Sequence, residues 1–383
     1  MSPAAQTPTR TRQRRARWPL LIALLLPFVA VEVWIRQVKM PSDLDFYTGR
    51  ENRASESDYA FTDAFSAYAP MPSTELIAGK TVNAHGFMGT PELEREKPEG
   101  VVRIAFLGGS STAGMGIDLR DTQTWPWKVA ETLGALDLGD ASVDFLNASL
   151  GGYTTFESLG RLWSRVRFFD PDVVVLYHGW NELYYFTPRR VESIHRWRML
   201  RDGDWTLQRT DNPHARFEPW AIDPFIGWSQ LLVKLRLRLG RQRTGEQSAE
   251  APVKALATDY DPRAPEIFRD NLRLIRSTCE SLGMELFVVK QATLLAADNS
   301  DADRARCQVA YHGFDAEAHL RAYAALHQVV DEEIASERII DGSVLDGRSD
   351  LFHDHVHPTS AGTTALAELV SGPLAQWIGE RER

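Results

Sequence analysis

The chain has 383 residues, of which 43% are apolar, and its formal net charge is -9 at pH 7. This length and apolar content allow one large hydrophobic core and exclude a disordered or fibrous protein. Arginines concentrated in the first 17 residues leave the remainder still more acidic, so no basic face for nucleic acid is expected. With only Cys279 and Cys307, the chain is not a disulfide-built scaffold. The two thiols could pair in an oxidising compartment or stay buried and free.

Residues 18–35 form an apolar run directly after the arginine cluster. At 1.5 Å per residue the run reaches about 27 Å, close to the roughly 30 Å hydrocarbon core of a bilayer. The arginine excess predicts a cytoplasmic N-terminus. Residues 1–36 are therefore expected to be a basic tail and a single-pass transmembrane helix in the inner (cell) membrane, with the catalytic domain periplasmic or extracellular. A cleaved signal peptide is the alternative interpretation.

Residues 37–100 are rich in turn formers and are predicted to be a stalk and approach segment, and residues 101–383 to be the globular domain. Strands are expected at 101–107, 143–146, 172–177, 285–289 and 338–340, and helices at 127–136, 155–168 and 265–282. The alternation, with strands too apolar to expose a face, predicts an α/β fold. We expect a three-layer α/β/α sandwich with a parallel sheet of about five strands.

An insertion at about 186–261 interrupts this alternation, because a structureless connection of that length is improbable in a compact domain. It contains Trp197, Trp205, Trp220 and Trp228, and then leucines interleaved with basic residues at 231–241. The leucine and basic stretch predicts an amphipathic helix. Such a helix could lie on a membrane surface or pack its leucines against the domain.

Four short motifs carry the chemistry. Ser110 lies where the first predicted strand turns into a helix, and His357 is preceded at three residues by Asp354. A serine needs a base to take its proton, and the base needs a third group to hold its tautomer. We therefore predict Ser110 as nucleophile, His357 as base and Asp354 as its partner. Ser111 is the neighbouring alternative nucleophile.

The other two motifs, at 147–152 and 179–182, follow the next two strands. Gly152 can offer a backbone amide and Asn181 a side-chain amide to the oxyanion. Together with the amide of Ser110 they are the predicted oxyanion hole, because carboxyl ends of neighbouring parallel strands converge at one edge.

In this order the motifs resemble the four blocks of the SGNH (GDSL-like) hydrolase superfamily, with Ser110, Gly152, Asn181 and His357 at the four named positions. The resemblance implies the flavodoxin-like fold of that superfamily. Gly109 and Glu182 depart from it, since aspartate is usual at both positions. Residues 83–87, with Arg103, also resemble membrane-anchored bacterial members.

Histidines alternate at 353, 355 and 357, with Asp350 and Asp354 nearby, which could suggest a metal site. His357 is already explained by the triad and no second ligand cluster appears elsewhere. No metal and no cofactor are therefore expected. Among the aromatic residues near the motifs, Trp125 and Trp127 are interpreted mainly as helix packing, while Tyr184 and Tyr185 could equally line a pocket or pack in the core.

The expected activity is that of a serine esterase acting through an acyl-enzyme on an O-acylated substrate, an acetylated glycan or a lipid-like ester, outside the inner membrane. One alternative is an O-acyltransferase that modifies a cell-envelope polysaccharide with the same residues. A second is a non-catalytic glycan-binding module. The expected partners are the acylated substrate and the membrane, and the oligomeric state is left open.

Overall fold

The computed structural model describes residues 18–38, 60–76, 79–115, 119–139, 141–186, 220–243, 256–307 and 309–381. The chain divides into two compact units. The helical unit comprises Met1–Arg50 and Pro213–Gln247, and the sheet unit comprises Glu51–Asn212 and Ser248–Arg383.

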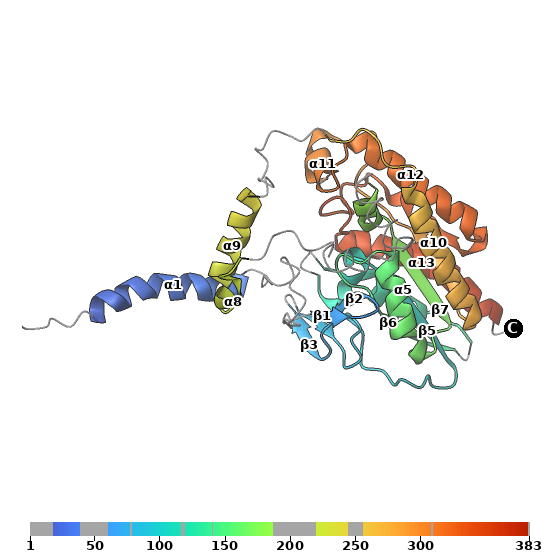
Figure 1. Cartoon of the computed structure of the whole chain (residues 1–383). Helices are drawn as coiled ribbons and strands as arrows, with labels where there is room; N and C mark the ends of the chain where they lie inside the picture. Colours follow the sequence, from blue (N-terminus) through green and yellow to red (C-terminus); the bar gives the residue numbers. More distant parts are fainter. Residues whose placement is uncertain are drawn as a thin grey trace, which may run out of the picture. The chain divides into compact units, whose positions relative to one another are not determined.

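A five-stranded parallel sheet is the centre of the sheet unit (Figure 1). Its order is β6 (Ser142–Asn147), β5 (Val101–Gly108), β7 (Val173–His178), β8 (Glu285–Lys290) and β9 (Ile339–Ile340). All four pairings are parallel. Every residue of β7 is buried, which explains the unbroken apolar run in the sequence. The predicted strands are confirmed.

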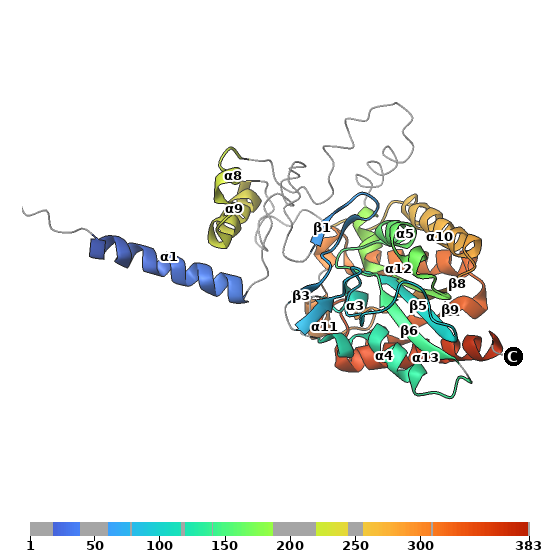
Figure 2. The same ribbon diagram turned by 90° about the horizontal axis from the view of Figure 1, so that it is seen from below.

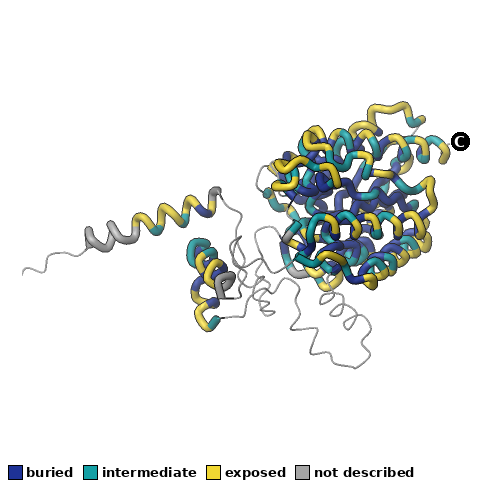
Figure 3. Tube along the Cα trace, turned by 90° about the horizontal axis from the view of Figure 1, so that it is seen from above, coloured by how far each residue is buried: buried dark blue, intermediate teal, exposed yellow. Residues whose placement is uncertain are grey.

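Helices cover both faces of this sheet (Figure 2). One face packs against α5 (Thr155–Ser164), α10 (Ala264–Ser281) and α12 (Ala316–Glu333). The other packs against α4 (Trp125–Gly134) and α13 (Ser360–Arg381), with Trp125 edge-on to Phe106 and Tyr177. Figure 3 shows the buried strands between helices whose outer sides are exposed. The predicted three-layer sandwich is confirmed.

Two hairpins precede the sheet, β1 (Ala60–Asp63) with β2 (Ala67–Pro70) and β3 (Thr74–Leu76) with β4 (Lys80–Val82). They belong to the sheet unit, because they bury apolar side chains against it, including Val82 and the Phe87 that follows. The segment expected to be a stalk is therefore part of the folded unit from residue 60 onward.

Arg103 on β5 is fully buried and connects β5 to its neighbours. Its guanidinium donates to both carboxylate oxygens of Asp144 at 2.8 and 2.7 Å and to the carbonyl of Phe169 at 2.9 Å. A buried charge is tolerated only when paired in this way. Arg103, which with residues 83–87 resembled membrane-anchored bacterial members, thus has a structural role at the start of the sheet.

The helical unit contains α1 (Trp18–Val38), α8 (Asp223–Ile226) and α9 (Gln230–Arg243). The predicted helices over the apolar run and over the leucine and basic stretch are both present, whereas Trp197 and Trp205 lie outside the described residues. Among the described residues no helix is long and apolar enough to cross a bilayer. The side chains described in α1, those of 26–36, include the ion pair Glu32–Arg36 at 2.8 Å.

Candidate active site

The structure brings Ser110, His357 and Asp354 together at the carboxyl end of the sheet. Ser110 is the first residue of the short helix α3 (Ser110–Ala113), which follows β5 directly. The Ser110 hydroxyl lies 2.7 Å from Nε2 of His357, and Nδ1 of His357 lies 2.8 Å from a carboxylate oxygen of Asp354. These distances allow a proton to pass from serine to histidine while the carboxylate holds the imidazole.

Asp354 is held as an anion. Although burial acts to raise its pKa, the hydrogen bond from His357, the nearby imidazoles and the amide of Val356 together lower the pKa below the usual range. Its second oxygen accepts from the amides of Val356 and His357, both at 2.9 Å. A carboxylate that accepts from both the backbone and the imidazole of the same loop fixes the ring orientation.

Ser111, the alternative nucleophile, faces away from His357. It is 3% exposed and its hydroxyl donates to the carbonyl of Val356 at 3.0 Å. The hydroxyl that meets the base is therefore that of Ser110.

Three groups are candidate donors to an oxyanion formed at Ser110. The amide of Ser110 lies at the first position of a helix, where backbone N–H groups have no intrahelical acceptor. Gly152 has φ +83, a conformation that favours glycine, and within the described part of the chain its amide has no acceptor. Asn181 uses one of its two side-chain hydrogens on the carbonyl of Tyr153 at 2.9 Å, which leaves the other available.

Gly109, one of the two departures from the resembled blocks, is explained by this geometry. A Cβ at position 109 would lie 2.6 Å from Nδ2 of Asn181 and 3.3 Å from the carbonyl oxygen of Tyr153. The absence of a side chain therefore lets the asparagine approach the nucleophile turn. The usual aspartate would displace one of the oxyanion donors in this chain.

Glu182, the other departure, turns away from the triad. It is 3% exposed, and one carboxylate oxygen accepts from the amide of Thr155 at 2.5 Å. Thr155 is the first residue of α5, so the carboxylate lies at the positive end of that helix, where a negative charge is stabilised.

Tyr68 on β2 is a site residue that sequence reasoning missed. Its hydroxyl donates to the carbonyl of Gly151 at 2.6 Å and would lie 2.7 Å from a Cβ at Gly152. Its own carbonyl accepts from the hydroxyl of Tyr153. The hairpin thereby supports the turn that presents the Gly152 amide, and no local sequence pattern signals this, because the contact spans more than 80 residues.

Asp354, His355 and His357 have potential metal-ligand atoms within 4.8 Å of one another. Asp354 and His357 use their facing atoms for the triad. The ring of His355 stacks on Trp180 with centroids 4.0 Å apart, and burial lowers its pKa to about 4. Among the described residues, Nδ1 of His355 is buried without a hydrogen-bond partner, 3.9 Å from a carboxylate oxygen of Asp354. Cys279 and Cys307 are both buried free thiols.

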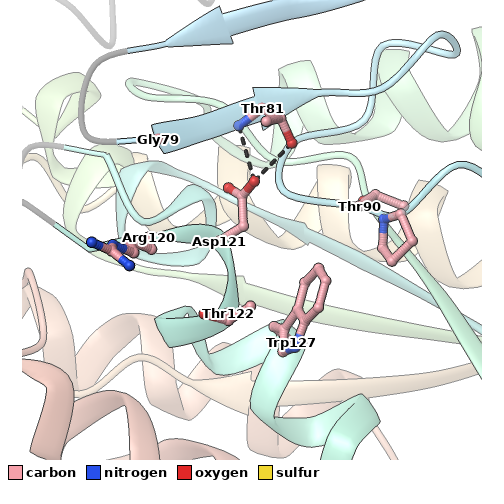
Figure 4. A pocket seen from close by; sticks show the side chains of 8 residues that line it. Gly79, Thr81, Thr90, Arg120, Asp121, Thr122 and Trp127 are labelled. Carbon is pink, nitrogen blue, oxygen red and sulfur yellow. Dashed lines mark hydrogen bonds between the residues drawn. The ribbon is translucent and has the colours of Figure 1, made fainter.

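A hollow of about 380 Å³ lies between the β3–β4 hairpin and the start of α4 (Figure 4). Within it Asp121 accepts from the amide and hydroxyl of Thr81 at 3.0 and 2.7 Å. None of the triad residues lines this hollow. Trp125 is 1% exposed and packs in the core, whereas Trp127 is half-buried and lines the hollow. The lining residues are Gly79, Thr81, Thr90, Pro91, Arg120, Asp121, Thr122 and Trp127.

No protein-family model and no curated protein sequence matches the chain. Among solved structures it is similar to the acetyl xylan esterase AlAXEase, with 12% identity and a TM-score of 0.39 over 71% of this chain and 98% of that one. It is also similar to TesA, with 16% identity and a TM-score of 0.38 over 71% and 97%. A GDSL-like lipase from Bacteroides thetaiotaomicron has 13% identity and a TM-score of 0.35 over 73% and 88%.

These neighbours include esterases and a GDSL-like lipase, the class that the four sequence motifs resemble. At such identities and TM-scores the similarity does not define the activity of this chain. The activity has to follow from its own site.

Proposed function

We propose that the protein is a serine esterase of the SGNH (GDSL-like) type that cleaves O-acyl esters through an acyl-enzyme. The observation that carries this proposal is the continuous hydrogen-bonded chain from Asp354 through His357 to Ser110. A non-catalytic glycan-binding module would have no need of a nucleophile, base and carboxylate in this register.

In the first half of the reaction the Ser110 oxygen attacks the ester carbonyl and its proton passes to Nε2 of His357. The negative oxygen of the tetrahedral intermediate accepts hydrogen bonds from the amides of Ser110 and Gly152 and from Asn181. His357 then gives the proton to the departing alcohol as the ester bond breaks. The products are the free alcohol and an acyl group on Ser110.

In the second half His357 takes a proton from water, the resulting hydroxide attacks the acyl carbonyl, and the proton returns to Ser110. The acid leaves and the enzyme is regenerated. An O-acyltransferase differs only here, because a sugar hydroxyl replaces the water and a new ester forms.

The substrate class that we propose is an O-acylated glycan. The hollow between the β3–β4 hairpin and α4 supports it, since its half-buried indole, carboxylate and threonine hydroxyls are groups that pack against and hydrogen bond a sugar ring. A polymer of this kind belongs outside the inner membrane, the location expected from the N-terminal arginines.

Fluorophosphonate labelling of the purified protein tests the nucleophile. The wild type and Ser111→Ala should be labelled, and Ser110→Ala should not. Equal labelling of Ser110→Ala and wild type would overturn the assignment.

Hydrolysis of p-nitrophenyl esters with and without oligosaccharide acceptors then separates the two reactions. Faster release of p-nitrophenol with an acceptor, together with an acylated sugar product, would identify a transferase. Release that is independent of the acceptor would identify an esterase.

A further inference from the structure

The helical unit exposes large apolar side chains on each of its elements. Around α8 these are Ile222, Phe225 and Trp228, at 53%, 73% and 65% exposure, and on α9 they are Leu235 and Leu239, at 50% and 40%. Among its described residues, the apolar side chains that it buries together are Ile226, Val233 and Leu237, with the partly buried Leu232. A surface of this kind marks an interaction site, because isolated apolar side chains are normal in water but gathered ones are not.

The described part of α1 is apolar on nearly all sides. Leu26, Val29, Val33 and Trp34 are each between 47% and 60% exposed, although a helix that is apolar all round belongs in an apolar medium. Figure 3 shows exposed residues along this helix. Phe28 of α1 lies against Trp228, with ring centroids 6.2 Å apart, so the exposed side chains of α1 and of the α8 region are continuous.

Polar groups between these helices are paired inside the unit. Glu32 accepts from the amides of Gln230 and Leu231 at 2.8 and 2.9 Å and from the hydroxyl of Ser229 at 2.9 Å, and so caps the N-terminus of α9. Arg36 donates to the carbonyl of Trp228 at 2.7 Å. The acidic residue that interrupts the apolar run of α1 thus has its partner in the insertion, and its charge is neutralised by a helix end.

A second buried pair connects α8 to α9. Arg236 donates to Asp223 at 2.7 Å, and the side chains are 3% and 0% exposed. The guanidinium also lies over the ring of Trp220, 3.6 Å from its centroid. Pairing of this kind keeps the charge of Arg236 inside the unit, while the apolar side chains point outward.

The remaining charge on α9 is positive. The helix contains five basic residues and no acidic one, and Arg238 is exposed between the exposed Leu235 and Leu239. Apolar side chains beside basic ones are the signature of a helix that lies in the headgroup region of an anionic bilayer.

We propose that α8 and α9, packed on the end of α1, form a lipid-binding surface. Phe225, Trp228, Leu235 and Leu239 enter the interface of the bilayer, and the exposed Arg238 contacts anionic headgroups. The insertion then has a role separate from the chemistry of Ser110, and this inference does not depend on the proposed esterase activity.

Fluorescent labels on single introduced cysteines test the proposal in the full-length protein, reconstituted in vesicles of phosphatidylglycerol and phosphatidylcholine. The native thiols are 1% and 6% exposed, so labelling at an exposed position is selective. Phe225→Cys and Leu239→Cys report on the helical unit. Trp163→Cys and Val344→Cys are matched controls, at exposed apolar positions of the sheet unit with 47% and 62% exposure. Unchanged thermal unfolding shows that each variant folds.

Lipids carrying a doxyl quencher near the headgroup should quench the labels at 225 and 239 several-fold more than those at 163 and 344. Equal quenching at all four positions would overturn the proposal. Labels at 225 and 239 that are shielded from aqueous iodide but not quenched by lipid would also overturn it, because a protein partner or a second copy would then cover the surface.

The variant Arg238→Gln tests whether the charge of Arg238 contributes to lipid binding. It should reduce the quenching at position 239 in vesicles containing phosphatidylglycerol and leave it unchanged in pure phosphatidylcholine. The same quenching before and after the substitution in anionic vesicles would overturn the assignment of the basic side chains to headgroups.

Discussion

The hydroxyl of Ser111 donates to the carbonyl of Val356 at 3.0 Å, although the two residues are 245 positions apart. Each is the direct neighbour of a triad member, Ser110 on one side and His357 on the other. The buried bond therefore sets the spacing between the nucleophile turn and the histidine loop. A second contact holds the same loop, because the hydroxyl of Thr293 donates to the carbonyl of His355 at 2.7 Å.

Replacing Ser111 by alanine should remove the hydrogen bond that holds the nucleophile turn and the histidine loop together, without removing a reacting group. One hydrogen bond contributes about 0.5–1.5 kcal/mol to stability, and a loss of that size in transition-state stabilisation is up to about tenfold in kcat. We expect kcat of Ser111→Ala on p-nitrophenyl acetate to fall by no more than this, with KM little changed. Complete loss of turnover, equal to that of Ser110→Ala, would contradict the assigned roles.

Adding a methyl group at Gly109 should damage the oxyanion hole. The new Cβ would lie 2.6 Å from Nδ2 of Asn181, so the asparagine must move. Loss of one oxyanion donor costs about 10² to 10³ in kcat, and we expect a fall in that range for Gly109→Ala, with thermal stability little changed. Gly134→Ala is the control, because a Cβ there meets nothing within 4 Å. Equal activity of both variants would show that Asn181 does not stabilise the oxyanion.

The change Asp354→Asn should leave the loop in place while removing the charge that holds the His357 tautomer. The asparagine oxygen can still accept from the amides of Val356 and His357. In a serine triad such a change lowers kcat by about 10⁴, and we expect a comparable fall in the rate of fluorophosphonate labelling of Ser110. The variant His353→Gln, at an exposed position of the same loop, should label at the wild-type rate. Unchanged labelling of Asp354→Asn would remove Asp354 from the triad.

Buried histidines should make the fold sensitive to acid. Burial lowers the pKa of His178 to about 3 and that of His355 to about 4. Because these values lie below the ordinary 6.5 of the unfolded chain, protonation favours unfolding. The stability that these two neutral histidines contribute is therefore fully present above about pH 6.5. It falls as the pH decreases toward 4, by at most about 1.4 kcal/mol per pH unit for each group.

Urea unfolding at several pH values between 7.5 and 4.5 measures this slope. His178→Asn should have a shallower dependence than the wild type, whatever its stability at neutral pH. Gly134→Ala, which changes no titratable group and adds a Cβ with nothing within 4 Å, should keep the wild-type slope. The same slope in the His178 variant as in the wild type would show that this group does not contribute to acid sensitivity.

The location outside the inner membrane stays a prediction of the N-terminal arginines. Protease added to intact spheroplasts should degrade the domain that contains Ser110, while a cytoplasmic marker protein remains intact. Protection of the domain until the spheroplasts are lysed would contradict the expected orientation.

Local sequence patterns predict the parallel sheet and the residues of the candidate site. Strands that are buried on both faces have continuous apolar sequences. Motifs at the carboxyl ends of such strands lie close together, because parallel strands end at one edge of the sheet. The same patterns predict Ser110, Gly152, Asn181, Asp354 and His357 as site residues, and the structure brings Ser110, His357 and Asp354 into hydrogen-bonding contact.

The support of those residues comes from tertiary packing. Tyr68 beneath Gly151, the need for glycine at position 109, and Glu32 at the start of α9 each depend on a contact between distant segments. Periodicity and motif spacing report only local geometry, because they record which face of an element is buried and not which element covers it. The partner of a buried charge or of an oxyanion donor is set by three-dimensional packing, so it has no signature at any fixed spacing in the chain.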